Sequence, residues 1–157
     1  MDIVSKDVRS RMMAGIRAKN TRPELTVRRL LHAAGVRYRL HRKDLPGAPD
    51  IVLPKYQAVI FVHGCFWHQH QGCALAKMPA SNRAFWETKL LGNRERDRAS
   101  IDRLRAQGWR VLTVWECATR DASTHCQLQT AIVEWIKSAR PILDIGAILP
   151  PFSARPS

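Results

Sequence analysis

The chain has 157 residues, of which 45% are apolar, so one domain with a single core is the expected organisation. Its 26 lysines and arginines face only 13 acids, which gives a formal net charge of +13. The basic excess is concentrated in residues 1–43, where the only acids are Asp2, Asp7 and Glu24. This charge favours a polyanionic partner, nucleic acid above all, over a merely solvated basic face or a ribosomal-type tail.

No stretch of the chain approaches the ~20 apolar residues that a membrane-spanning helix needs. Residues 1–6 also lack the apolar segment of a secretory signal. These features argue against a membrane protein or an exported one, and we expect a cytoplasmic, nucleoid-associated location. In such a reducing compartment, the four cysteines serve more often as metal ligands or free thiols than as disulfides.

The N-terminal region predicts two helical segments. Residues 6–18 are expected to form a short basic helix or arm. A second helix should begin after Thr21, which can cap it, and Glu24 suits the positive end of that helix. Its apolar residues follow helical spacing as far as Ala34, which predicts a helix that covers a sheet.

Short apolar segments at residues 37–41, 50–53 and 58–63 predict three strands in an antiparallel meander. The last two of these segments are separated by a turn that begins at Pro54. The meander would form one side of a small sheet.

The second half of the chain predicts a helix, a strand and another helix. A long, charged helix should extend from Ser81 or Asn82 to about Gln107. A strand at 109–115 and a helix at about 127–139 follow. We therefore expect an α/β or α+β domain with helices on both sides of a mixed sheet. Its parts would be a basic arm, a single domain and a Pro-rich, mostly extended tail, at residues 1–20, 21–140 and 141–157.

A carboxylate and a histidine at the ends of neighbouring strands suggest a site for a divalent cation. Asp50 stands at the first position of its expected strand, and the next strand ends in His63. If these strands pair, the two side chains approach each other. Mg²⁺ keeps several of its waters, so one carboxylate, a backbone carbonyl and DNA phosphate oxygens would suffice to bind it. Alone, Asp50 would equally be a turn residue or a cap.

His68 is the best candidate for a base that deprotonates water, because a free imidazole titrates near neutral pH. It lies in an expected loop shortly after His63. Asp97 on the long helix could fold back to orient it, as carboxylates do in other histidine–acid pairs. Otherwise Asp97 would belong to a solvated, ion-paired helix face, and His68 would be an ordinary polar residue.

Cysteines and a histidine in the same region predict a structural zinc site. Cys65, His70 and Cys73 are close enough in sequence for one loop to supply three ligands. Cys117, just after the strand at 109–115, could complete a closed tetrahedral site, which leaves no position for a reactive water. Three further residues compete for the fourth position: His68, His125 and Cys126. Buried or reactive free cysteines are the alternative.

Phe66 and Trp67 lie between a candidate zinc ligand and the candidate base, where a core side chain is hard to hold. Apolar wedges that open a base step occur in several DNA-binding proteins, and aromatic side chains stack on bases. Trp86, near the start of the long helix, could join these two residues. The remaining tryptophans fit ordinary core packing.

Over roughly residues 5–140 the chain resembles the very-short-patch (Vsr) mismatch repair endonucleases. The resemblance lies in six segments, at residues 9–13 (RSRMM), 45–50 (LPGAPD), 61–68 (FVHGCFWH), 85–86 (FW), 93–97 (NRERD) and 108–117 (GWRVLTVWEC). It implies a restriction-endonuclease-like fold, related to the PD-(D/E)XK nucleases. The second acid and the lysine of those nucleases are replaced here by Phe61 and His63.

The resemblance also implies an activity, a Mg²⁺-dependent nick of one strand 5′ to the T of a T:G mismatch. Such mismatches arise when 5-methylcytosine deaminates. By motif, Asp50 and the backbone carbonyl of Val62 would hold Mg²⁺, and Glu24 and His63 would support its waters. His68, together with Asp97, would assist the chemistry.

Carried over in the same way, zinc falls on four residues: Cys65, His70, Cys73 and Cys117. Phe66, Trp67 and Trp86 become a wedge beside the mismatch, and Met13 in the N-terminal arm clasps the duplex from the other groove. The chain departs from the family pattern at Val62, where threonine is common. It also has one additional residue, within Gln71-Gly72, before Cys73.

Two alternative functions stay open. A restriction-type endonuclease of the same fold would cut both strands of an undamaged site, although the aromatic wedge argues against it. The chain could instead be a zinc-stapled DNA-binding module without catalysis. In that case Asp50, His63 and His68 would have no catalytic role. The expected partners are double-stranded DNA with a T:G mismatch, mismatch-repair accessory proteins and a repair polymerase. A single active site that nicks one strand suits a monomer.

Overall fold

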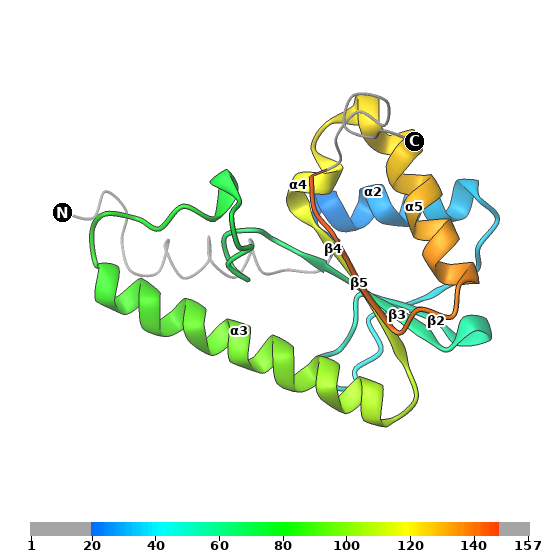
Figure 1. The fold of residues 1–157 in the computed structure, drawn as a ribbon, viewed down its shortest axis with the longest axis horizontal. Coiled ribbons are helices and arrows are strands. Elements are labelled where there is room, and N and C mark those ends of the chain that lie inside the picture. Colours follow the sequence, from blue (N-terminus) through cyan, green and yellow to red (C-terminus); the bar gives the residue numbers. More distant parts are fainter. Residues whose placement is uncertain (1–19, 148–157) are drawn as a thin grey trace.

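A computed structural model describes residues 20–147, which form a five-stranded sheet with helices on both faces (Figure 1). The spatial order of the strands is β1-β2-β3-β4-β5. Their bounds are β1 Arg39–Leu40, β2 Ile51–Leu53, β3 Ala58–His63, β4 Arg110–Trp115 and β5 Ile142–Ile145. Strands β1, β2 and β3 pair antiparallel, while β3, β4 and β5 pair parallel. The expected mixed sheet flanked by helices is therefore confirmed.

The antiparallel meander follows from local turn chemistry. Pro54–Tyr56 forms a short 3₁₀ turn after β2, and Gln57 adopts a left-handed conformation at φ 48° before β3 begins. Five of the six residues of β3 are buried, since this central strand is covered on both faces. The register of the meander places Asp50, just before β2, beside the end of β3.

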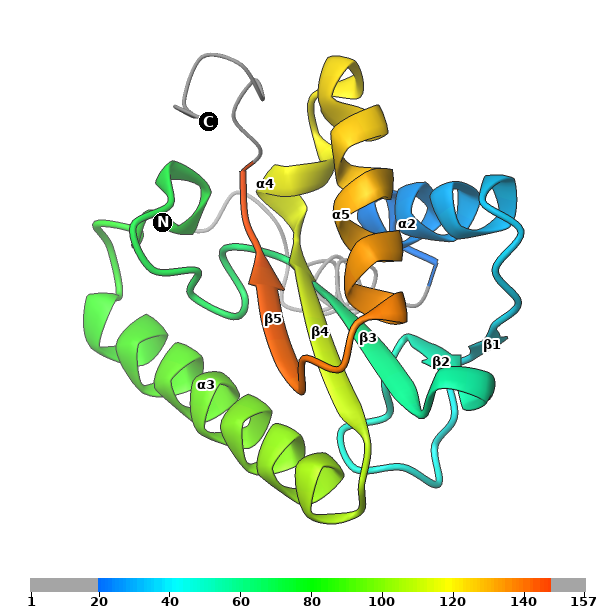
Figure 2. The ribbon, with the colours of Figure 1, turned by 45° about the vertical axis from the view of Figure 1, so that its right-hand side comes forward.

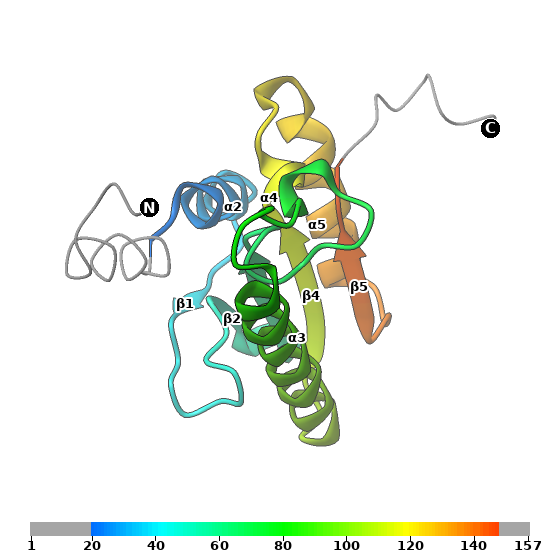
Figure 3. The ribbon, with the colours of Figure 1, turned by 90° about the vertical axis from the view of Figure 1, so that its left-hand side faces the viewer.

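Four α-helices complete the described part of the fold: α2 Arg22–Ala33, α3 Arg83–Ala106, α4 Glu116–Thr119 and α5 His125–Lys137. Helix α2 begins as predicted, because the Thr21 side chain accepts a hydrogen bond from the Glu24 N–H at 3.4 Å. Figures 2 and 3 show α3 on one face of the sheet and α2 with α5 on the other. Each parallel strand pair is thus joined by a helical crossover, β3 to β4 through α3 and β4 to β5 through α5.

Alternating residues of the strands supply two separate apolar cores. Ile60 of β3 belongs to the larger core, which packs under α2 and α5. Its neighbours Val59 and Phe61 belong to the smaller core, which packs under α3 with Leu104. This alternation is the two-residue period of a strand, and it directs Phe61 and His63 to the α3 face.

Arg110, the first residue of β4, ties the sheet to the end of α5. Its guanidinium donates hydrogen bonds to the carbonyl oxygens of Trp135 at 3.1 Å and Ile136 at 2.7 Å. The guanidinium also lies over the Trp135 ring, with its central carbon 4.6 Å from the ring centroid. A cation at these carbonyls stabilises the negative end of the helix.

The C-terminal region requires a correction. We expected an extended tail from Pro141 onward, but Ile142–Ile145 is strand β5, which pairs with residues 111–114 of β4. These four residues form a strand because the crossover through α5 returns the chain beside β4; the short apolar run between Pro141 and Gly146 is compatible with a strand, although the sequence analysis assigns it to the Pro-rich tail.

The predicted arm at residues 6–18, Met13 within it, and residues 148–157 lie outside the described residues. None of the helices within residues 20–147 has the length and apolar character needed to cross a membrane.

Candidate active site and zinc cluster

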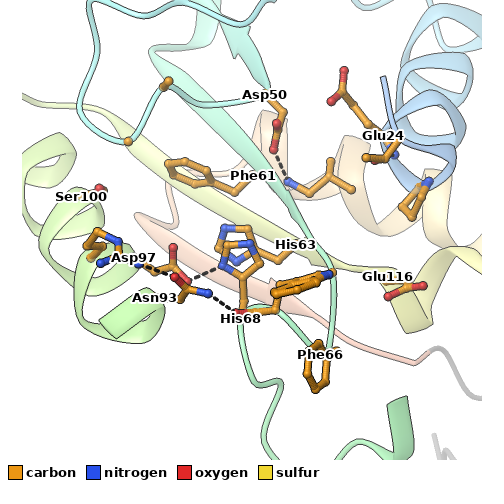
Figure 4. A pocket seen from close by; sticks show the side chains of 18 of the residues that line it. Glu24, Asp50, Phe61, His63, Phe66, His68, Asn93, Asp97, Ser100 and Glu116 are labelled. Carbon is orange, nitrogen blue, oxygen red and sulfur yellow. Dashed lines mark hydrogen bonds and ion pairs between the residues drawn. The ribbon is translucent and has the colours of Figure 1, made fainter. Parts of the chain in front are cut away.

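A pocket of about 590 Å³ opens beside the carboxyl ends of β3 and β4 (Figure 4). Its walls come from the start of α2, the turn before β2, the loop after β3, and the middle of α3. All five residues expected to take part in catalysis line it: Glu24, Asp50, His63, His68 and Asp97.

Asp50 lies at the entry to β2 and contacts the end of β3. Its Oδ2 accepts a hydrogen bond from the Val62 N–H at 2.8 Å, so the acid lies against the main chain of the residue expected to share its cation. Burial raises the pKa of Asp50 to about 6; the Val62 N–H opposes this rise, and the negative charge of Glu24 adds to it. A nearby cation would stabilise the ionised form of such a buried carboxylate.

Glu24 is only 2% exposed, which is unusual for a charged side chain. Its Oε2 lies 2.8 Å from Nε2 of His41 and 3.4 Å from a guanidinium nitrogen of Arg28. Ligand atoms of Glu24, His41 and Asp50 lie within 4.8 Å of one another. The two acids therefore face one point from different elements, α2 and the start of β2.

The sequence analysis did not identify His41. Its backbone has φ 51°, and its N–H donates to the Asp50 carbonyl oxygen at 3.1 Å. This left-handed conformation turns the imidazole from the end of β1 toward Glu24. No motif surrounds His41, so no signal in the sequence alone would have identified it.

His63 and His68 stack face to face, with ring centroids 3.8 Å apart and planes 6° from parallel. Nδ1 of His68 lies 2.5 Å from Oδ2 of Asp97 on α3. His63 is 6% exposed, and burial together with the neighbouring His68 holds its pKa well below the usual 6.5. His63 is thus held neutral directly beneath the His68 ring, and Asp97 orients that ring.

Two aromatic residues that line the pocket, Phe66 and Trp67, form a cluster with Trp86 of α3. The ring centroids of Phe66, Trp67 and Trp86 lie 5.0 to 5.8 Å apart. Asn93 of α3 donates to the Trp67 carbonyl oxygen at 2.9 Å and so holds the loop against the helix. Phe85, which the sequence analysis did not select as a DNA contact, is 56% exposed beside Trp86.

The donor set of Cys65, His70, Cys73 and Cys117 fits zinc. Their ligand atoms lie within 4.8 Å of one another. Nδ1 of His70 is 3.7 Å from Cys65 Sγ and 3.4 Å from Cys117 Sγ, close to the ~3.6 Å that separates N and S ligands of a tetrahedral zinc with Zn–N bonds of about 2.0 to 2.1 Å and Zn–S bonds of about 2.3 Å. Burial raises the pKa of the Cys65 and Cys117 thiols, so thiolates here require a cation. The cluster is consistent with a structural zinc site.

The rival ligands are engaged elsewhere or exposed. His68 pairs with Asp97, His125 lies 2.8 Å from the Thr119 carbonyl oxygen, and Cys126 is exposed. The additional residue before Cys73 does not displace this ligand, because Gly72 takes a positive φ of 75° that lets the loop turn back.

Two contacts around the cluster were not expected from the sequence. Glu116 Oε1 accepts a hydrogen bond from the Cys65 N–H at 3.2 Å and also lines the pocket. After β5, Gly146 approaches the His70 ring so closely that an added Cβ would lie 3.0 Å from its Cε1. The missed strand β5 thus brings a third segment against the zinc cluster.

Several known proteins are similar to this chain in sequence. A family model described as DNA mismatch endonuclease Vsr matches residues 1–75. The Type II nicking enzyme V.XorIIP of Xanthomonas oryzae pv. oryzae is 52% identical over 120 residues, which are 76% of this chain and 88% of that protein. The DNA mismatch endonuclease Vsr of Escherichia coli is 44% identical over 137 residues, 86% of this chain and 87% of that protein. The Type II nicking enzyme V.NmeAIP of Neisseria meningitidis is 41% identical over 138 residues, 88% and 98% respectively.

Proposed function

Because this chain belongs to the Vsr family of DNA nicking endonucleases, we propose that it nicks one strand of duplex DNA 5′ to the T of a T:G mismatch. The main support is the meeting of Asp50, His63 and the His68–Asp97 pair in one pocket beside a cluster of partly buried aromatic rings. The similarity to a Type II nicking enzyme supports a single-strand cut, and the similarity to the DNA mismatch endonuclease of Escherichia coli supports a mismatched substrate.

The residues around Asp50 fit a hard divalent cation, since the buried Glu24 and the partly buried Asp50 bring carboxylate oxygens close together there. We assign Mg²⁺ to Asp50 and the Val62 carbonyl, with Glu24 and His63 close to its waters. Bound there, Mg²⁺ would neutralise the reacting phosphate and polarise a water molecule.

His68 acts as the general base in this proposal. Asp97 holds Nδ1, which leaves Nε2 to accept the proton of the attacking water. The water oxygen then forms its bond to phosphorus while one phosphate ester bond breaks. Because His63 stays neutral beneath the ring, the protonated His68 meets no like charge from its stacking partner.

The aromatic cluster would recognise the lesion. Phe66, Trp67 and Trp86 present rings beside the pocket, and stacking on a base contributes roughly 1 to 3 kcal/mol for each ring. Unstacking the bases of a mismatched pair costs less free energy than unstacking a Watson–Crick pair. Insertion of the rings is therefore favoured at the mismatch. The resemblance to the family assigns Met13 to the opposite groove, and the net charge of +13 attracts the duplex.

The test uses end-labelled duplexes that carry T:G, T:A or C:G in a 5-methylcytosine context, incubated with the protein and Mg²⁺. We expect a nick in the T strand of the T:G duplex alone, abolished in Asp50→Asn. Asp44→Asn is the matched control, because the Asp44 side chain is 63% exposed and pairs with Arg42 away from the pocket. Cleavage of both strands of a paired duplex would instead indicate a restriction-type enzyme. Binding without cleavage under any divalent cation would indicate a non-catalytic module.

A further inference from the structure

Trp115 lies between the zinc cluster and the catalytic histidines. In the parallel pair of β3 and β4, Trp115 is the register partner of His63, so both side chains project from the same face of the sheet. Trp115 is also two residues before the zinc ligand Cys117. The end of β4 therefore belongs to both sites.

The rings form a continuous series from one site to the other. Trp115 stacks on the zinc ligand His70, with centroids 4.3 Å apart and planes 7° from parallel. Its edge meets His63 at 5.3 Å and 74°, and His63 in turn stacks on His68 at 3.8 Å. The contact of Trp115 with His63 lies within the usual range of aromatic pairs, about 4.5 to 7 Å, and the two stacked contacts are closer than that range.

His63 depends on this packing because hydrogen bonding does not hold its inner nitrogen. Its Nδ1 is buried and has no hydrogen-bond partner among residues 20–147. The second torsion of a histidine side chain has broad preferences, so neighbouring groups decide the plane of the ring. Phe61, at 5.4 Å and 44°, provides only a tilted contact.

We propose that Trp115 is a positioning residue that transmits the geometry of the zinc cluster to the His63–His68 pair. His70, which would be fixed in orientation as a zinc ligand, supports one face of Trp115, and Trp115 in turn limits the rotation of the His63 ring. The zinc cluster then does more than attach a loop to the sheet. The catalytic part of this inference rests on the proposed nicking function, while the structural coupling does not.

The test compares Trp115→Leu with Trp109→Leu. Trp109 precedes the opposite end of the same strand, is also partly buried, and packs against the core under α3. We expect both variants to melt at a lower temperature and to retain zinc. Only Trp115→Leu should lose kcat, by roughly 10- to 100-fold, with little change in KM. Trp115→Phe, which keeps a ring, should recover most of the loss.

A second arm does not depend on activity. His70→Cys preserves a four-ligand zinc site but removes the ring that stacks on Trp115. In nitrogen-15 spectra of the histidine rings of the DNA-free protein, we expect His70→Cys to shift the signals of His63 and His68. When His70→Cys is made in the Trp115→Leu variant, we expect little additional shift of these signals. Mutations at coupled residues have effects that do not add.

Equal kcat for Trp115→Leu and Trp109→Leu would overturn the inference, as would unshifted His63 signals in zinc-loaded His70→Cys. If the wild-type protein nicks no duplex, the proposed function fails, and the spectra alone still decide whether Trp115 couples the two sites.

Discussion

Asp50 should be required for nicking and, at the same time, should lower the stability of the folded protein. Its carboxylate is mostly buried against β3, and its pKa is about 6 instead of the ordinary 3.8. Such a shift corresponds to roughly 3 kcal/mol, and we expect about 2 to 3 because the side chain retains some contact with solvent. Asparagine is uncharged and can still accept the Val62 N–H, so Asp50→Asn should stabilise the protein while it abolishes nicking.

The sign of the pH dependence follows from proton binding. The folded state holds a proton on Asp50 up to about pH 6, whereas the unfolded chain releases it near 3.8. The wild-type protein therefore loses stability as the pH rises through this window, and the full cost is present above it. The advantage of Asp50→Asn should vanish below about pH 4, reach about half its value near pH 5, and be complete near pH 8.

Urea unfolding of both proteins, followed by tryptophan fluorescence without added divalent cations, measures this difference. Added Mg²⁺ should then stabilise the wild-type protein but not the variant, because a ligand stabilises only the state that binds it. A variant no more stable than the wild type near pH 8, or an advantage that is the same at pH 5 and pH 8, would refute the reasoning.

Three further predictions concern the zinc cluster, the turn before β2 and the end of α5. Cys73→Ser should lower zinc content in elemental analysis and lower Tm by on the order of 10 °C, whereas Cys126→Ser, at an exposed position, should change neither. Gly47→Ala would place a Cβ 2.7 Å from that of Ser100 at a positive φ, and should cost about 2 kcal/mol or more in urea unfolding. Gly35→Ala, with a similar φ and no atom within 4 Å, should cost only about 1 kcal/mol, and equal losses would contradict the clash. Arg110→Met should cost about 1 to 3 kcal/mol in thermal unfolding, since α5 loses the donors at its last carbonyls; an unchanged Tm would show that water replaces them.

Most of the secondary structure could be predicted from the sequence, because local physics encodes it. Thr21 caps α2 as predicted, and β3 has the expected bounds Ala58–His63. The strand expected at residues 109–115 begins one residue later, and α3 lies within its expected limits. Capping groups, turn residues and periodic apolar spacing act over a few residues, so they can be recognised without the fold.

Three of the four candidate zinc ligands could be predicted from the sequence for a similar reason. Cys65, His70 and Cys73 lie within one short loop, where any compact conformation brings them close. The fourth ligand, Cys117, needed the parallel pairing of β3 and β4, which places the end of one strand beside the end of the other. The pattern alone left three rivals for that position.

Tertiary structure decided the rest, because it depends on which elements become neighbours. Asp97 reaches His68 only because α3 crosses back over the sheet between two parallel strands, and Glu24 meets His41 only where α2 packs beside the meander. Strand β5 exists because α5 returns the chain beside β4. The sequence by itself determined most of the candidate residues, the three longer helices of the described region, most strands and the basic charge. Strand order and register, set by burying two apolar cores at once, decided which of those residues share a site.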